Sequence, residues 1–114
     1  MRVLVVEDEF LIALSLSEMI QGMGYRPLGP ARSVAEAREL LAAETPDAAM
    51  LDCRLRDGLS SPVAELLRDR GVPFVWLTGY EQSDLPRPGE PVLRKPATTD
   101  DMERALRALL DGRG

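Results

Sequence analysis

The sequence predicts an α/β fold, a five-stranded parallel sheet that is doubly wound, with helices on both faces. Two patterns in the sequence predict it. Several short apolar runs have the length of strands, and the segments that alternate with them have apolar residues at helical spacing. Alternation of this kind implies right-handed crossovers between parallel strands. The length of 114 residues suits one domain, so we expect a single domain over residues 1–114.

Five short runs are expected to form the strands. Most of them consist of apolar residues that suit a strand buried on both faces, as in parallel sheets. The second run contains prolines, which cannot donate to the hydrogen-bond ladder, so this strand is expected at an edge of the sheet. In chain order, the expected strands are residues 3–6, 25–30, 48–51, 73–77 and 92–93.

Local signals define the helices between them. Apolar positions recur at helical spacing over residues 10–23. Ser33 and Thr98 each begin a capping box, with an acid three positions later, and each opens a helix. Ser61-Pro62 opens a short helix with a cap and a first-turn proline. Residues 79–91 hold three prolines, so the fourth helix is expected to be shortened or absent.

Composition excludes several classes of function. The net charge of -5, with basic residues spread among acids, argues against nucleic acid as a direct ligand. The chain has no histidine, which excludes histidine-based triads and histidine metal sites. The single cysteine, Cys53, is expected to be a packing residue and fits a reducing cytoplasm. No apolar run is long enough for a membrane span, so we expect a cytoplasmic protein.

Residues suited to phosphoryl chemistry follow four of the five expected strands. Glu7 and Asp8 follow the first strand, Asp52 the third, Thr78 the fourth and Lys95 the fifth. The carboxyl ends of parallel strands meet at one edge, where ligands bind. Clustered carboxylates take up protons or hold a cation, and oxygen ligands alone favour Mg²⁺ or Mn²⁺. An aspartate beside such an ion and an ammonium is suited to attack a phosphoryl group.

Four motifs, in order and spacing across the whole chain, resemble the receiver domains of bacterial two-component response regulators. They are Val3-Leu4-Val5-Val6-Glu7-Asp8-Glu9, Leu51-Asp52-x-x-Leu55-x-Asp57-Gly58, Leu77-Thr78-Gly79 and Leu93-Arg94-Lys95-Pro96. The resemblance implies a flavodoxin-like sheet with strand order 2-1-3-4-5. It also implies a signalling switch rather than an enzyme, operated by phosphorylation within a phosphorelay.

The same resemblance implies the roles of the acids. Asp52 would be the phosphoacceptor. The metal ligands would be Asp8, bound directly, Glu7, bound through water, Asp52 itself and the backbone carbonyl of Arg54.

The resemblance further implies how the phosphoryl group is bound and which proteins the domain works with. Thr78 and Lys95 would bind the phosphoryl oxygens, and the Lys95–Pro96 peptide bond would be cis. The donor would be a histidine kinase or a histidine phosphotransfer protein, and the output would pass to a protein partner. The docking surface is expected to include the first helix, which has more apolar residues than one buried face needs, Leu11, Ile12, Leu14 and Leu16 among them.

The sequence departs from the common receiver pattern in the fourth crossover. Val92 stands where the family commonly has an aromatic residue, and Thr78 to Lys95 is shorter than usual. Residues 74–80, which end Thr-Gly-Tyr, are similar to an atypical alphaproteobacterial subgroup. We therefore expect an output loop with Gly79 and Tyr80 that becomes ordered on phosphorylation.

Three alternatives stay open at this point. A pseudo-receiver would bind partners without phosphorylation, although the acids, threonine and lysine are all present. An aspartyl-phosphate phosphatase usually needs a second acid two residues after the nucleophile, where this chain has Arg54. A flavin or nucleotide binder would need a phosphate loop after the first strand, where the acids at residues 7–9 would repel phosphate.

Overall fold

The computed structural model describes residues 1–79 and 85–111. Tyr80, proposed for the output loop, lies outside the described residues. In chain order the elements are β1 (Arg2–Val6), α1 (Phe10–Gly22), β2 (Arg26–Ala31), α2 (Val34–Ala43), β3 (Ala48–Asp52), β4 (Arg54–Leu55), β5 (Gly58–Leu59), α3 (Ser61–Asp69), β6 (Phe74–Thr78), β7 (Val92–Arg94) and α4 (Thr99–Asp111).

The main sheet is parallel, with strand order β2-β1-β3-β6-β7. This is the expected order 2-1-3-4-5, because β6 and β7 are the fourth and fifth strands of that sheet. The proline-containing β2 is an edge strand, as predicted. None of the helices among the described residues is long and apolar enough to cross a membrane.

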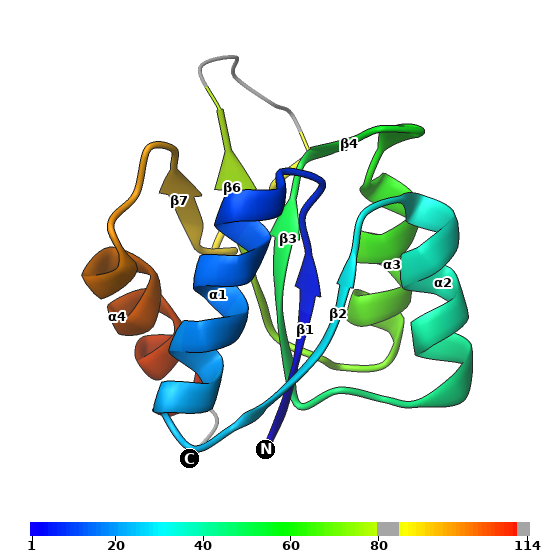
Figure 1. Ribbon diagram of the computed structural model, residues 1–114. Coiled ribbons are helices and arrows are strands. Elements are labelled where there is room, and N and C mark those ends of the chain that lie inside the picture. Colours follow the sequence, from blue (N-terminus) through cyan, green and yellow to red (C-terminus); the bar gives the residue numbers. More distant parts are fainter. Residues whose placement is uncertain (80–84, 112–114) are drawn as a thin grey trace.

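Helices cover both faces of the sheet, α1 and α4 on one side and α2 and α3 on the other (Figure 1). Successive β1 residues divide between the two cores, because side chains of a strand alternate in direction. Leu4 and Val6 pack with residues of α2 and α3, whereas Val3 and Val5 pack with residues of α1 and α4. The central strands β3 and β6 are buried along their whole length, as their apolar sequences predicted.

The capping box at Thr98 is complete, whereas at Ser33 only the serine cap forms, because the Glu36 carboxylate accepts from Arg32 N–H at 2.7 Å. The Ser33 hydroxyl accepts a hydrogen bond from the Glu36 backbone N–H at 3.1 Å. At α4, Asp101 N–H donates to the Thr98 hydroxyl at 3.0 Å, and the Asp101 carboxylate accepts from Thr98 N–H at 3.2 Å. Each bond satisfies a backbone donor that has no partner within its own helix.

The expected cap at Ser61 is wrong. Ser61 is the first residue of α3, and Ser60 precedes it without capping the helix through its side chain. The Ser60 hydroxyl instead donates to the Asp52 carbonyl oxygen at 2.6 Å and lies 3.1 Å from that of Cys53. The short antiparallel ribbon of β4 and β5 was not predicted.

The fourth crossover lacks a helix in its described part, residues 85–91, which agrees with the prediction from its prolines. A hydrogen-bonded turn is present instead, in which Glu90 N–H donates to the Arg87 carbonyl at 3.0 Å.

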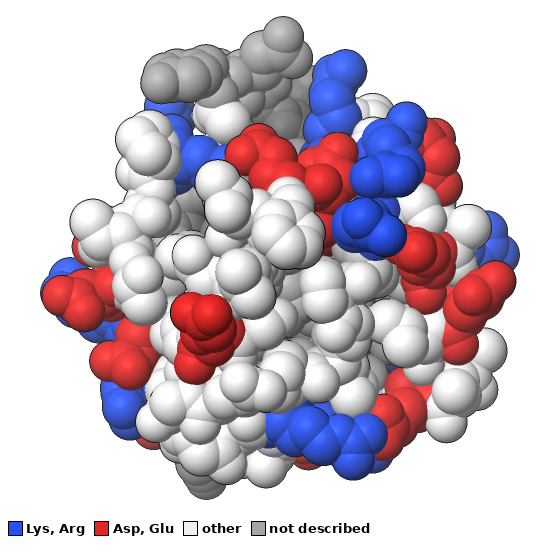
Figure 2. All heavy atoms as spheres, in the orientation of Figure 1, with Lys and Arg blue, Asp and Glu red and all other residues white. Residues whose placement is uncertain are grey.

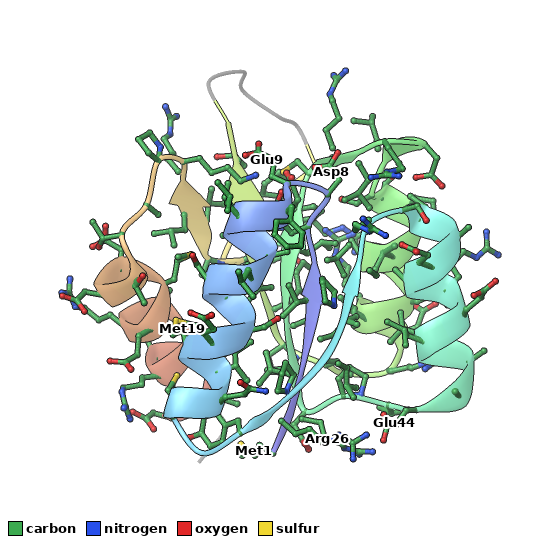
Figure 3. All side chains as sticks on the ribbon, viewed as in Figure 1. Met1, Asp8, Glu9, Met19, Arg26 and Glu44 are labelled. Atoms are coloured by element: carbon green, nitrogen blue, oxygen red, sulfur yellow. The ribbon has the colours of Figure 1, made fainter. Side chains whose placement is uncertain are left out.

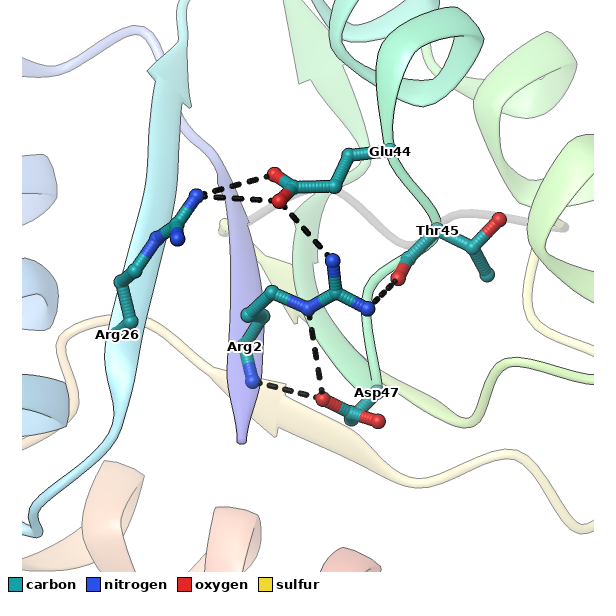
Figure 4. A network of polar contacts seen from close by, with 5 residues as sticks. All are labelled: Arg2, Arg26, Glu44, Thr45 and Asp47. Carbon is teal, nitrogen blue, oxygen red and sulfur yellow. Dashed lines mark hydrogen bonds and ion pairs between the residues drawn. The ribbon is translucent and has the colours of Figure 1, made fainter.

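At the end of the sheet where β1 begins, a network of ion pairs joins β1, β2 and the segment before β3 (Figure 4). Glu44 pairs with Arg2 at 3.0 Å and with Arg26 at 3.1 Å. Asp47 accepts from the backbone N–H of Arg2 at 2.8 Å. Figure 3 shows Arg26 and Glu44 at the lower edge, far from Asp8 and Glu9 at the upper edge.

Candidate functional site

Three carboxylates meet at the carboxyl edge of the sheet, as predicted. Glu7 and Asp8 follow β1, Asp52 ends the neighbouring β3, and one oxygen of each lies within 4.8 Å of the others. The pairing of Val6 with Leu51 sets this proximity, because it places the ends of the two strands side by side. Figure 2 shows acidic side chains gathered at this upper edge, with basic side chains next to them.

Lys95 reaches this cluster from the end of β7. Its ammonium lies 2.8 Å from Glu7 Oε2, donates to Asp52 Oδ2 at 3.0 Å, and lies 3.8 Å from Glu9 Oε1. Its backbone N–H donates to the Thr78 carbonyl oxygen at 2.7 Å, which joins the ends of β6 and β7. The Lys95–Pro96 peptide bond is cis. The prediction that the ends of these four strands meet is confirmed, but the contact of Lys95 with Glu9 was not predicted.

Burial dominates the electrostatics of Glu7, whose side chain is wholly enclosed. Burial, opposed by the contact with Lys95 and reinforced by the charge of Asp52, raises the pKa of Glu7 to about 7. Burial lowers the pKa of Lys95, but the contacts with Glu7 and Asp52 outweigh it and leave that pKa raised. Lys95 therefore stays charged at neutral pH, while Glu7 exchanges its proton in that range.

The site fits a divalent cation. Its ligands are all carboxylate oxygens, which hard cations prefer. Among the described residues, Glu7 Oε2 is buried and makes no hydrogen bond of regular geometry, although the Lys95 ammonium lies 2.8 Å away. A buried oxygen in this condition is costly unless a cation or a proton satisfies it. Glu7, Asp8 and Asp52 could together hold one metal ion.

The loop after Asp52 is held by two residues whose roles the sequence did not reveal. Ser60 binds the Asp52 carbonyl, as described above. Asp57 lies in the turn between β4 and β5, and its carboxylate accepts from the backbone N–H groups of Val34 at 2.8 Å and Ala35 at 3.3 Å. Asp57 thus binds the first turn of α2, and these bonds lower its pKa. The serine pair and the Asp-Gly turn mark the loop in the sequence, but not these partners.

A largely apolar surface lies beside the site on α1. Phe10, Leu11 and Leu14 are exposed, with 74% of Leu11 accessible. Leu16, another apolar residue of this helix, is buried in the core and does not contribute to the surface. The face over α1 is mainly uncharged (Figure 2). Next to it is a groove of about 310 Å³, whose lining includes Leu11, Ile12, Ser15, Pro96, Ala97 and Met102.

Comparison with known proteins shows what the chain resembles, although no family model matches it. SdrG from Sphingomonas melonis Fr1 is 41% identical, with 96% of this chain and 95% of that chain covered and a TM-score of 0.81. The receiver domain of the response regulator PhyR from Erythrobacter litoralis is 28% identical, with 96% and 89% covered and a TM-score of 0.84.

Curated relatives agree. The transcriptional regulatory protein PdtaR of Mycobacterium tuberculosis is 40% identical over 86 residues. The regulator PhyR of Methylorubrum extorquens is 34% identical over 84 residues. These matches take in 74% and 71% of this chain, but they span only 42% and 32% of the length of those relatives.

The fold, the carboxylate cluster and the lysine define a response-regulator receiver domain, a module of phosphorylation-based two-component signalling. Within this family, the chain belongs to the atypical PhyR-like subgroup.

Proposed function

We propose that this domain is a switch in which Asp52 accepts a phosphoryl group from a phosphohistidine of a histidine kinase or phosphotransfer protein. A single observation carries the proposal: Asp52 receives a hydrogen bond from Lys95 within a cluster completed by Glu7 and Asp8. A carboxylate oxygen of Asp52 attacks phosphorus, and the phosphorus–nitrogen bond to the donor imidazole breaks. The imidazole nitrogen keeps the electron pair and takes a proton.

Each side chain of the cluster has a part in this transfer. Glu7, Asp8, Asp52 and the Arg54 carbonyl would hold Mg²⁺ or Mn²⁺, which would offset the negative charge of the incoming phosphoryl group. The Lys95 ammonium, 3.0 Å from Asp52 Oδ2, supplies a second positive charge. Thr78 ends β6 next to Lys95, and its hydroxyl would bind a phosphoryl oxygen.

The donor is proposed to dock on α1. Phe10, Leu11 and Leu14 expose apolar area in α1, immediately after the acidic residues that follow β1. Such a patch beside a site fits a helical partner that brings its phosphohistidine to Asp52. A protein is also proposed as the output target. In support, PhyR from Bartonella quintana, which is 25% identical to this chain, is an anti-anti-sigma factor.

Phosphate incorporation tests the proposal. The domain is incubated with Mg²⁺ and phosphoramidate, a small donor with a phosphorus–nitrogen bond, and the intact mass is measured. The wild type should gain one phosphoryl group that hydroxylamine removes, as it does from an acyl phosphate. Asp52→Asn should gain none, whereas Asp69→Asn, the same change at the exposed end of α3, should be labelled normally.

Two results would contradict the proposal. Labelling that persists in Asp52→Asn would place the acceptor elsewhere. A wild-type domain that binds partners but takes up no phosphoryl group from any donor would be a pseudo-receiver. Sustained hydrolysis of an added phosphate ester would instead support the phosphatase alternative.

A further inference from the structure

A largely enclosed ion pair anchors the fourth crossover away from the carboxylate cluster. Glu90 accepts hydrogen bonds from Arg68 Nε at 2.8 Å and Nη2 at 2.7 Å, and the two side chains are only 18% and 17% exposed. The indole N–H of Trp76 donates to the same carboxylate at 3.0 Å. The Arg68 guanidinium also lies 5.7 Å and 6.0 Å from the ring centres of Phe74 and Trp76, and it donates to the Leu85 carbonyl at 3.2 Å.

The backbone before Glu90 is shaped to present this carboxylate. Residues 87–90 form a tight turn, closed by a hydrogen bond from Glu90 N–H to the Arg87 carbonyl at 3.0 Å. Gly89, the third residue of this turn, has φ of 87°, which residues with a side chain rarely adopt. The Arg87 N–H donates to the Glu90 carboxylate at 2.8 Å. Bidentate contact with Arg68 holds the pKa of Glu90 at about 2, so the carboxylate is charged at neutral pH.

The strand that follows this turn is short and partly exposed. β7 contains only three residues, and its first, Val92, is 46% exposed. Backbone hydrogen bonds hold its two ends, from Trp76 N–H to the Pro91 carbonyl at 2.9 Å and from Lys95 N–H to the Thr78 carbonyl at 2.7 Å. Because Lys95 directly follows β7, the position of its ammonium depends on how firmly this short strand stays docked.

We propose that Glu90 is a positioning residue for phosphoryl transfer. The clamp formed by Arg68, Glu90 and Trp76 fixes the start of β7 against β6 and α3, and thereby holds Lys95 over Asp52. This inference rests on the proposed phosphoacceptor function. A misplacement of about 1 Å at a reacting group can cost roughly 100-fold in rate, even when the change lies far from the chemistry. Loss of the clamp should therefore slow transfer although Glu90 touches no reacting atom.

Glu44 offers a matched control. It too pairs with an arginine, at 3.0 Å from Arg2, but at the opposite end of the sheet from Lys95 (Figure 4). Glu44→Gln and Glu90→Gln each remove one carboxylate charge from an arginine contact with little change in shape. If ion pairing mattered only for stability, both variants would be phosphorylated at the wild-type rate once folded.

The experiment compares the wild type, Glu90→Gln and Glu44→Gln. Urea unfolding establishes the folded fraction, and phosphoramidate with Mg²⁺ gives the rate of labelling per folded molecule. Affinity for beryllofluoride, a phosphoryl mimic, is measured in parallel. Trp76 is the only tryptophan, so its single indole N–H resonance reports directly on the bond to Glu90.

We expect Glu90→Gln to shift the indole resonance and to lower both the labelling rate and the beryllofluoride affinity by about 10- to 100-fold. Glu44→Gln should match the wild type in all three. Arg68→Lys keeps the charge but loses the bidentate geometry, so it should be intermediate, and it decides the matter if Glu90→Gln does not fold.

Two outcomes overturn the inference and are distinguishable. The positioning role alone is refuted if the wild type accepts a phosphoryl group normally and Glu90→Gln accepts it equally fast. If Glu90→Gln does not fold, an equally fast Arg68→Lys refutes it in the same way. A wild type that accepts none refutes the proposed function, and the positioning role with it.

Discussion

Lowering the pH should weaken Mg²⁺ binding, because the proton and the cation compete for Glu7. Burial, aided by the charge of Asp52, raises the pKa of Glu7 to about 7. At that pKa the carboxylate is roughly nine-tenths ionised at pH 8 and one-tenth ionised at pH 6. The apparent affinity for Mg²⁺ should therefore fall about tenfold between these values. An ordinary glutamate, with a pKa of 4.5, would change this affinity by only a few per cent over the same range.

Calorimetric titration with MgCl₂ in buffers of different ionisation enthalpy measures both the affinity and the protons released. Near pH 7, each bound ion should release roughly half a proton. The variant Glu7→Gln should bind the ion more weakly but with no such pH dependence. A wild-type affinity that stays constant from pH 6 to 8, with no proton release, would refute the reasoning that burial controls this carboxylate.

The same shift should be visible in the stability of the metal-free domain. Because the folded state binds the Glu7 proton more tightly than the unfolded state, stability should increase as the pH falls from about 7 to 4.5. The gain attributable to Glu7 is roughly 3 kcal/mol, measured as the difference between the wild type and Glu7→Gln. Glu90 has the opposite effect. Because its pKa is lowered to about 2 in the folded state, its contribution to stability is lost as the pH falls from 4.5 to about 2.

Three further outcomes are expected. Ser60→Ala should cost about 1–3 kcal/mol in urea unfolding and slow labelling of Asp52, because it leaves a buried carbonyl without its hydroxyl donor; unchanged stability would contradict this. Asp57→Ala should lower the urea midpoint at neutral pH by exposing the first turn of α2, and the difference should shrink in acid as the carboxylate of the wild type becomes protonated. Leu16→Ala should lower the free energy of unfolding by about 2–5 kcal/mol, whereas Leu11→Ala should change it by less than about 0.5 kcal/mol. Leu11→Ala should nevertheless slow phosphoryl transfer from a protein donor, while labelling by phosphoramidate serves as the control.

Patterns in the sequence were enough to predict a parallel sheet and the main residues of the site. Alternation of strand and helix patterns implied parallel strands, and parallel strands bring their carboxyl ends to one edge whatever the details of packing. That rule was enough to predict that Glu7, Asp8, Asp52 and Lys95 would meet. The helix caps were readable for a related reason, since each joins residues only three positions apart.

The residues that support this site could be identified only from contacts in the folded chain. Asp57 binds α2 across 23 positions in the sequence, and Glu90 binds Arg68 across 22. Neither pair follows a periodic pattern, because the contacts depend on how a loop folds back onto a helix. The orientation of α1 likewise decided that Leu16 is buried while Leu11 is exposed. Helical spacing identifies a set of apolar residues, but the direction of the helix against the sheet selects which of them enter the core.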